Sequence, residues 1–119
     1  DSVIRKRRFI VKYLSEKLGS VVKIPCDIHR SSPFIIPLTF RSSSSKAIVA
    51  AALENVSVPC NVDYRFNVSK WGWVNEHSHG INKTPNADSY LKRTIFLYVN
   101  ERYRRKDIDY ISRIISGSL

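Results

Sequence analysis

The stretch TPNADSYLKRTIFLYVN, from Thr84 to Asn100, contains a helix signal followed at once by a strand signal. Thr84-Pro85 places an N-cap residue before a proline at the first helical position, so we expect a helix through about Arg93. Ile95 to Val99 is a short, continuously apolar run of the kind found in buried strands. The stretch therefore predicts a helix that leads directly into a core strand.

Apolar spacing predicts one helix near each end of the chain. From Val3 to Leu18 apolar residues recur at spacings of 3, 4 and 7, which indicates a helix with one buried stripe, and Gly19 is expected to end it. A final helix follows Tyr103, and Gly117 is expected to cap or fray its end. The stripe of this final helix consists of Ile108, Ile111 and Ile115, with Ile114 beside it.

The first helix opens with the basic run Arg5-Lys6-Arg7-Arg8. Cations near a helix N-terminus oppose the helix macrodipole, so this is a poor start for an isolated helix. Such a beginning would result if the sequence started inside a longer helix or inside a linker that leads into a helix. We therefore expect that Asp1 is not the natural start of the polypeptide.

The middle of the chain alternates between extended and helical signals. Phe34 to Phe40 predicts a buried strand, and its Pro37 favours an edge position or a bulge. Ser42 to Ser45 offer N-cap oxygens for a short helix over Lys46 to Leu53 that ends near Asn55. Val58 to Phe66 alternates apolar and polar residues, which predicts a second strand with one buried face.

These elements predict a small α/β domain with a mostly antiparallel sheet and helices packed on one face. The chain has 119 residues, of which 43% are hydrophobic and 25% charged, so one domain over residues 1–119 is expected. No apolar run approaches the roughly 20 residues that cross a bilayer. Two cysteines, Cys26 and Cys60, are too few for a disulfide scaffold, and we expect a cytoplasmic protein.

No set of residues with the spacing of a catalytic or metal site is found in the sequence. His77 and His79 would need a third ligand from His29, Cys60 or a distant carboxylate, so exposed loop histidines are the favoured interpretation. Cys60 falls on the buried face of its strand and is expected to behave as a small hydrophobe. We therefore expect neither a catalytic thiol nor a metal centre.

The net charge of +10 favours anionic partners or simply solubility. Two basic clusters stand out, Arg5 to Arg8 and Arg102 to Lys106, and Tyr103, Trp71 and Trp73 could stack on nucleic-acid bases. No known nucleic-acid-binding signature organises these residues, so a solvated basic face is favoured. A free-standing basic module that binds nucleic acid or another polyanion stays as the alternative function.

The stretch from Thr84 to Asn100 resembles the DegT/DnrJ/StrS-type nucleotide-sugar aminotransferases, in which a Pro-x-Ala helix leads through an arginine into an extended run. The segment Asp107-Ile108-Asp109-Tyr110-Ile111 is similar to the family's last helix, and Ser45 to Leu53 to an earlier helix. Arg7 to Leu18 is similar to the helix that joins the large and small domains, and Phe34 to Phe40 to the strand after it. The resemblance covers essentially the whole chain, at about the length of the family's C-terminal small domain.

This resemblance implies a fold type I architecture without its large domain. Residues 1–19 would form the linking helix and residues 33–119 the body of the small domain. It implies pyridoxal phosphate (PLP) in the full-length parent, whose cofactor lysine lies in the large domain. Lys70 is not given that role, no catalytic residue is assigned, and this chain is expected to bind no cofactor and to be catalytically silent alone. The parent is expected to be a homodimer acting on a nucleotide-linked keto sugar.

Tyr64 and Trp71 are the substrate-binding candidates, because aromatic faces suit sugar faces and bases. The chain departs from the family pattern at three places. Asp63-Tyr64 stands where a His-Tyr pair followed by a second His is usual, Tyr98 stands where proline is general, and Arg104-Arg105-Lys106 replaces an acidic or Thr-rich helix start. A divergent substrate or a relaxed function would account for the last two departures. Besides the small domain of an enzyme and the free-standing basic module, a third possible function is that of a degenerate, non-catalytic relative used only for association.

Overall fold

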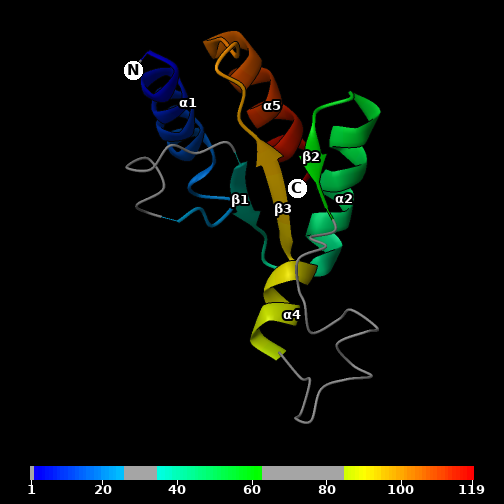
Figure 1. Cartoon of the computed structure of the whole chain (residues 1–119). Coiled ribbons are helices and arrows are strands. Elements are labelled where there is room, and N and C mark those ends of the chain that lie inside the picture. Colours follow the sequence, from blue (N-terminus) through cyan, green and yellow to red (C-terminus); the bar gives the residue numbers. More distant parts are fainter. Residues whose placement is uncertain (1, 26–34, 63–84) are drawn as a thin grey trace, which may run out of the picture.

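A computed structural model of the chain describes residues 2–25, 35–62 and 85–119. Helices and strands alternate along the described chain, as the sequence predicts (Figure 1). The elements are α1 (Ser2–Leu18), β1 (Ile35–Thr39), α2 (Ser43–Asn55), β2 (Cys60–Asn61), α4 (Pro85–Lys92), β3 (Thr94–Tyr98) and α5 (Arg105–Ser118).

The described strands form an antiparallel three-stranded sheet in the order β1-β3-β2. Ile36 pairs with Leu97 and Leu38 with Ile95 across the β1–β3 ladder. β1 is therefore an edge strand, which confirms the edge alternative for Pro37, because a proline on an edge removes no central ladder hydrogen bond. The predicted fold class, a small α/β domain with an antiparallel sheet, is confirmed.

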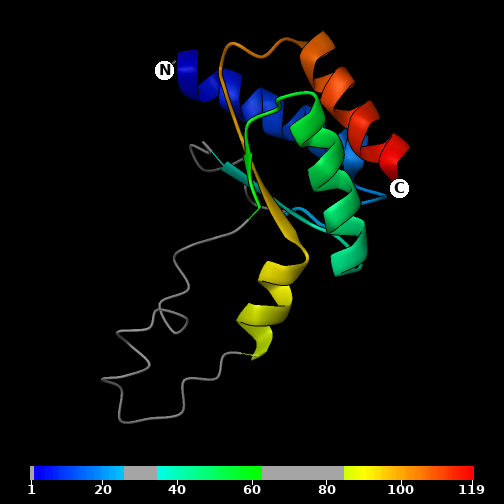
Figure 2. The same ribbon diagram turned by 90° about the vertical axis from the view of Figure 1, so that its right-hand side faces the viewer.

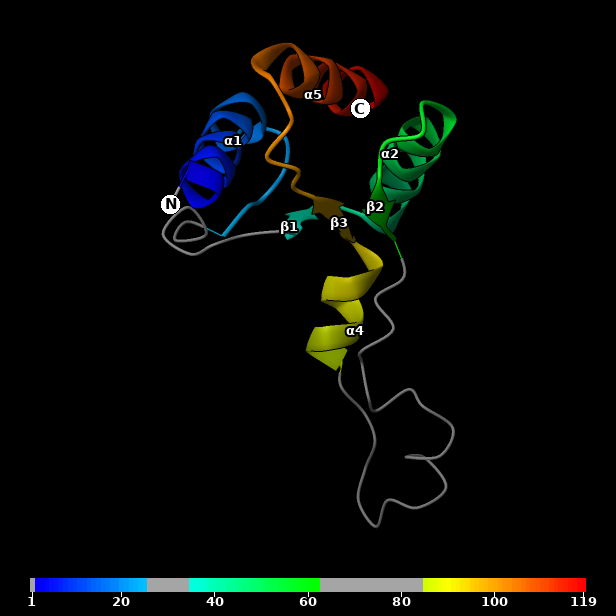
Figure 3. The same cartoon turned by 45° about the horizontal axis from the view of Figure 1, so that its top comes forward.

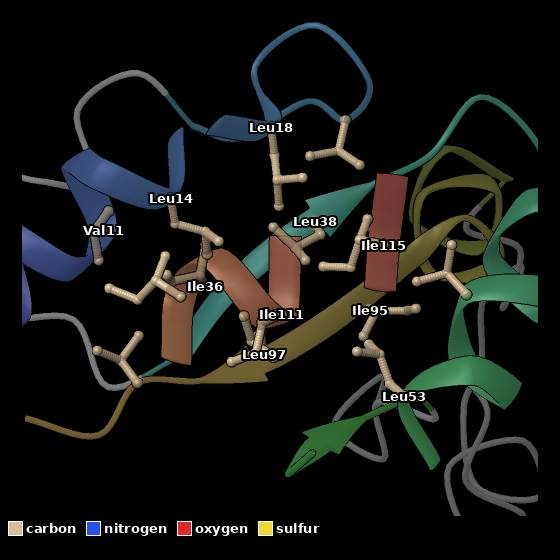
Figure 4. Close-up of a cluster of buried hydrophobic side chains, with 14 of the residues drawn as sticks. Val11, Leu14, Leu18, Ile36, Leu38, Leu53, Ile95, Leu97, Ile111 and Ile115 are labelled. Atoms are coloured by element: carbon tan, nitrogen blue, oxygen red, sulfur yellow. The ribbon is translucent and has the colours of Figure 1, made fainter. Parts of the chain in front are cut away.

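The helices α1, α5 and α2 cover one face of the sheet, while α4 extends from the end at which β3 begins (Figures 2 and 3). Buried side chains from this helix layer meet those of the covered sheet face, and the labelled ones point toward one another in Figure 4. Among the described helices none combines the length and the apolarity needed to span a membrane. The core consists of Ile10, Val11, Leu14, Leu18, Val22, Ile36, Leu38, Phe40, Val49, Leu53, Ile95, Leu97, Val99, Ile108, Ile111 and Ile115.

Polar contacts fix α1 and α5 side by side. The Tyr13 hydroxyl donates to Asp109 Oδ1 at 2.8 Å, and Lys17 Nζ lies 3.3 Å from the same oxygen. The hydrogen bond from Tyr13, together with Lys17, lowers the pKa of the Asp109 carboxyl, and Asp109 in turn raises the pKa of Lys17. Nearer the start of α1, Arg7 pairs with Glu101 at 3.2 Å. Because residue numbers rise together in these pairs, the two helices run parallel.

Thr94 forms the junction between α4 and β3. Its side chain is fully buried, and its hydroxyl donates to the Tyr90 carbonyl at 2.5 Å. The Thr39 hydroxyl lies 3.1 Å from it, and the Phe40 amide donates to the Arg93 carbonyl at 2.7 Å. The last turn of α4 is thus hydrogen-bonded to the end of β1, which sets the direction in which β3 enters the sheet.

Two sequence expectations about glycine have different outcomes. α1 ends at Leu18 as predicted, and a Cβ on Gly19 would lie 2.8 Å from the Ser15 carbonyl oxygen. Gly117 does not cap α5, because the helix continues through Ser118 with Leu119 as its C-cap, whereas the alternative that Gly117 frays the helix end stays a prediction. No described glycine has a positive φ, so Gly117 does not adopt the left-handed conformation with which glycine usually ends a helix.

The expected extent of the second strand is also changed. The structure assigns β2 to Cys60–Asn61, and the expected strand residues from 63 onward lie outside the described residues. Within the described part the predicted alternation holds, since Val58, Cys60 and Val62 pack against the core. The covered face of β2 is therefore the one predicted.

Replacing Ile111 with aspartate is expected to unfold the domain. Ile111 is 5% exposed in the centre of the α5 stripe, and an unpaired buried carboxylate costs roughly 4 kcal/mol or more. Tyr110→Asp is the matched control, because Tyr110 is the preceding residue and is 45% exposed. Thermal melting followed by circular dichroism should show no native transition for Ile111→Asp and a normal one for Tyr110→Asp. A native melting curve for both variants would contradict the packing of α5.

Acid should weaken the contact between α1 and α5. Because the pKa of Asp109 is lowered in the folded state, its ionised form adds stability above the unfolded-state pKa, and this is lost as the pH falls through the folded-state pKa. The melting temperature of the wild type should exceed that of Asp109→Asn at neutral pH, and the gap should close on acidification. A gap that stays constant with pH would show that the charge of Asp109 contributes nothing.

Candidate functional site

The sheet face opposite α1, α2 and α5 is the candidate functional surface. Alternation along β3 directs Phe96 and Tyr98 to this face, opposite the buried Ile95 and Leu97. Register places Ile35 beside Tyr98, and both Pro37 and Asn61 beside Phe96. We call the surface formed by Ile35, Pro37, Asn61, Phe96 and Tyr98 the open face.

Apart from Asn61, the open face presents apolar or aromatic side chains, and α4 lies at the end of the sheet rather than over this face (Figure 2). Tyr98 is 39% exposed, and Phe96 is only partly buried. One-sided antiparallel sheets usually present polar residues to water on their free face. Adjacent apolar side chains at such a position are typical of a surface that contacts further protein or a ligand.

Lys46 connects the two ends of the segment that carries the predicted substrate-binding residues. Its Nζ donates to the Val62 carbonyl at 2.6 Å and to the Leu91 carbonyl at 2.9 Å. Val62 follows β2, whereas Leu91 lies in the last turn of α4. At this end of a helix a cation also interacts favourably with the helix macrodipole. The lysine therefore holds the end of β2 close to the end of α4. Sequence reasoning placed Lys46 only at the start of a helix and missed this contact.

The predicted site residues fall mostly outside the described residues. Tyr64 and Trp71, the substrate-binding candidates, lie there, as do Lys70 and the histidines considered for a metal site. Cys60 is described, and burial raises the pKa of its thiol. Because the thiolate is the reactive form, a half-buried Cys60 packed against the core fits the expected role of a small hydrophobe. Over the described ranges no three potential metal ligands gather.

The structure brings the two basic clusters of the sequence together. Arg5 and Lys6 from α1 line the same surface cavity as Arg102 and Arg104, which precede α5. Arg105 lies over the rings of Phe9 and Tyr13, with its Cζ 5.3 Å and 5.8 Å from their centroids. The clusters are almost 100 positions apart in sequence, so spacing alone could not predict that they share a surface.

The described lysines do not fit the attachment of pyridoxal phosphate. A Schiff-base lysine needs a desolvated amine of lowered pKa. Lys46 is half-buried, but its ammonium group donates to two carbonyls, and the pKa of Lys17 is raised by Asp109. The others, Lys6, Lys12, Lys23, Lys92 and Lys106, are exposed. No step that involves the cofactor can be derived from these residues.

Comparison with known proteins gives matches to solved structures only. No protein-family model and no curated protein sequence matches the chain. Spr1654 from Streptococcus pneumoniae, assigned as a sugar aminotransferase and solved in its PMP form, superposes with a TM-score of 0.83 at 16% identity, over 98% of this chain and 31% of that one. A DegT DnrJ EryC1 StrS aminotransferase from Brucella abortus gives 0.78 at 20% identity, over 96% and 30%.

A third solved structure differs in its reaction. GDP-4-keto-6-deoxy-D-mannose-3-dehydratase from E. coli, with bound hydrated PLP, gives a TM-score of 0.76 at 15% identity, over 96% of this chain and 31% of that one. These matches confirm the resemblance seen in the sequence at the level of fold. The chain has the fold of one part of the sugar aminotransferases and spans about a third of the length of the structures it matches.

Replacing Lys46 with methionine should destabilise the domain. The change keeps much of the aliphatic stem but removes both hydrogen bonds to the carbonyls, and loss of a charged donor costs about 1.5–3 kcal/mol. Lys12→Met, at an exposed position on α1, is the matched control. Urea unfolding should show a lower midpoint for Lys46→Met than for Lys12→Met. Equal midpoints would mean that Lys46 does not hold β2 and α4 together.

Proposed function

We propose that this chain is the C-terminal small domain of a PLP-dependent enzyme that acts on a nucleotide-linked keto sugar, with transamination as its reaction. The observation that carries the proposal is the pair of coverages, 98% of this chain but 31% of Spr1654. A likeness that spans almost all of one chain and a third of the other is what a single domain of a larger enzyme produces. In this proposal the parent is cytoplasmic and dimeric, and it holds PLP in its larger domain.

The open face is the surface on which the rest of the parent would lie. Tyr98 is 39% exposed there, and about two thirds of each matched structure has no counterpart in this chain. Burying such a face against a larger domain would stabilise the assembly by about 25 cal/mol per Å² of apolar surface. The small domain would thus help to close the active site, and the chain alone would be catalytically silent.

Tyr64 and Trp71 remain the proposed contacts to the sugar or its nucleotide. The support for them is their aromatic character and their position between residues 62 and 91, which Lys46 draws together. In this proposal an aromatic ring packs on the apolar face of a sugar or on a base. Loss of turnover in Tyr64→Ala and Trp71→Ala variants of the full gene product would support the contacts, and unchanged turnover would reject them.

The proposal is tested by the gene from which the chain derives. We expect the reading frame upstream of Asp1 to encode a larger domain with a cofactor lysine. The purified full product should show the visible absorbance of bound PLP and transfer an amino group from an amino acid to a nucleotide-linked keto sugar. The 119-residue chain alone should do neither.

Two results would change the assignment. A full product that releases water from the keto sugar without gaining nitrogen would be a dehydratase, as in the E. coli structure. A start codon close to Asp1 would contradict the domain proposal and favour the stand-alone basic module. Mass spectrometry of the sugar product distinguishes the two reactions.

A further inference from the structure

A basic groove lies between the first half of α1 and the connection from β3 to α5. It has a volume of about 640 Å³. We call it the N-terminal groove. Its lining residues are Arg5, Lys6, Phe9, Ile10, Glu101, Arg102, Tyr103 and Arg104.

The charge of the N-terminal groove is strongly positive. Four of its lining side chains are cationic, and Glu101 is its carboxylate. Arg7 donates to Glu101 through both Nε and Nη2, at 3.3 Å and 3.2 Å. A hydrogen bond from its own backbone amide and the bond from Arg7 lower the pKa of the Glu101 carboxyl, so it stays ionised and neutralised by Arg7. The positive charge of Arg102 also lowers the pKa of Glu101, but within the described residues none of the four lining cations forms a salt bridge.

The start of α5 lies at the same end of the domain as the groove (Figure 1). Here the Asp107 carboxylate accepts a hydrogen bond from the Arg104 amide at 2.8 Å, so this helix end is already capped. The four cations that line the groove repel one another, and a bound anion would relieve that repulsion.

The size and the limits of the groove favour a small ligand over a nucleic-acid strand. Small-molecule sites are typically about 300–1,000 Å³, and apolar side chains of Phe9, Ile10 and Tyr103 form part of the lining. A second basic cavity, lined by Lys23, Arg41 and Arg93, lies beside Gly19 at the opposite end of α1. The two cavities share no lining residue and lie toward opposite ends of α1, a helix of 17 residues that is about 25 Å long.

We propose that the N-terminal groove binds a small phosphorylated molecule that carries at least two negative charges. Guanidinium groups of Arg5, Arg102 and Arg104 provide paired N–H donors that match phosphate oxygens, and Lys6 adds a fourth charge. This site is separate from the open face and does not depend on the proposed enzymatic function. The ligand chemistry is that of a diphosphate, either free or as part of a nucleotide.

The test is isothermal titration calorimetry of the 119-residue chain with inorganic pyrophosphate and with ADP, at a constant ionic strength of about 0.15 M. Arg5→Ala combined with Arg102→Ala should weaken binding about tenfold or more, because each replaced arginine removes charge-assisted hydrogen bonds. Arg5→Lys combined with Arg102→Lys should retain a larger share of the affinity. Both arginines are exposed, so circular dichroism should show unchanged folding.

The matched control places the same loss of charge in the second cavity, with Lys23→Ala combined with Arg41→Ala. This control should bind pyrophosphate as the wild type does. Tighter binding of ADP than of pyrophosphate would identify a nucleotide as the ligand source, and equal binding would identify the diphosphate group alone. Three results would each overturn the proposal. The first is an equal loss of affinity in the Arg5→Ala/Arg102→Ala variant and in the Lys23→Ala/Arg41→Ala control, the second is no binding by the wild type, and the third is tighter binding of a single-stranded oligonucleotide than of pyrophosphate or ADP.

Discussion

The alternation of buried and open-face side chains from Ile95 to Tyr98 in β3 is the constraint on which the rest of this domain depends. Ile95 and Leu97 are buried beneath α1, α2 and α5, and each fully buried side chain of this kind contributes about 1.5–3 kcal/mol. A shift of one residue in register would exchange them for Phe96 and Tyr98. The junction at Thr94 sets that register, because it hydrogen-bonds the end of α4 and lies next to Thr39 of β1. The alternation of side chains along β3 thus produces both the core and the open face.

Apolar spacing was enough to predict α1 and α5, capping residues indicated α2 and α4, and short apolar runs indicated β1 and β3, because each of these signals is local to its own element. The hydrogen bonds between Tyr13 and Asp109 and between Lys46 and Leu91 could not be predicted in this way. They join residues far apart in the chain and depend on how the elements pack. Gly117 shows the opposite failure, because a local stop signal was overridden in a helix with a buried stripe. The candidate site residues Tyr64 and Trp71 stay predictions.

Fold similarity at 15–20% identity is understandable from the same alternation. A core of this type requires apolar side chains at alternating strand positions and at helical spacing, and many residues satisfy that requirement. Surface chemistry is under no such constraint, and in this chain it is strongly basic at one end of α1 and α5. The open face and the N-terminal groove have no residue in common, so the two proposals made for them can be tested independently.

The central claim is that the open face is covered by further protein in the native enzyme. Hydroxyl-radical footprinting of the 119-residue chain and of the full gene product, read out by mass spectrometry, measures this directly. Tyr98 should be oxidised readily in the chain alone and be protected in the full product, whereas Tyr110, 45% exposed on α5, serves as the internal reference and should react to a similar degree in both. Equal oxidation of Tyr98 in the two proteins would contradict the account.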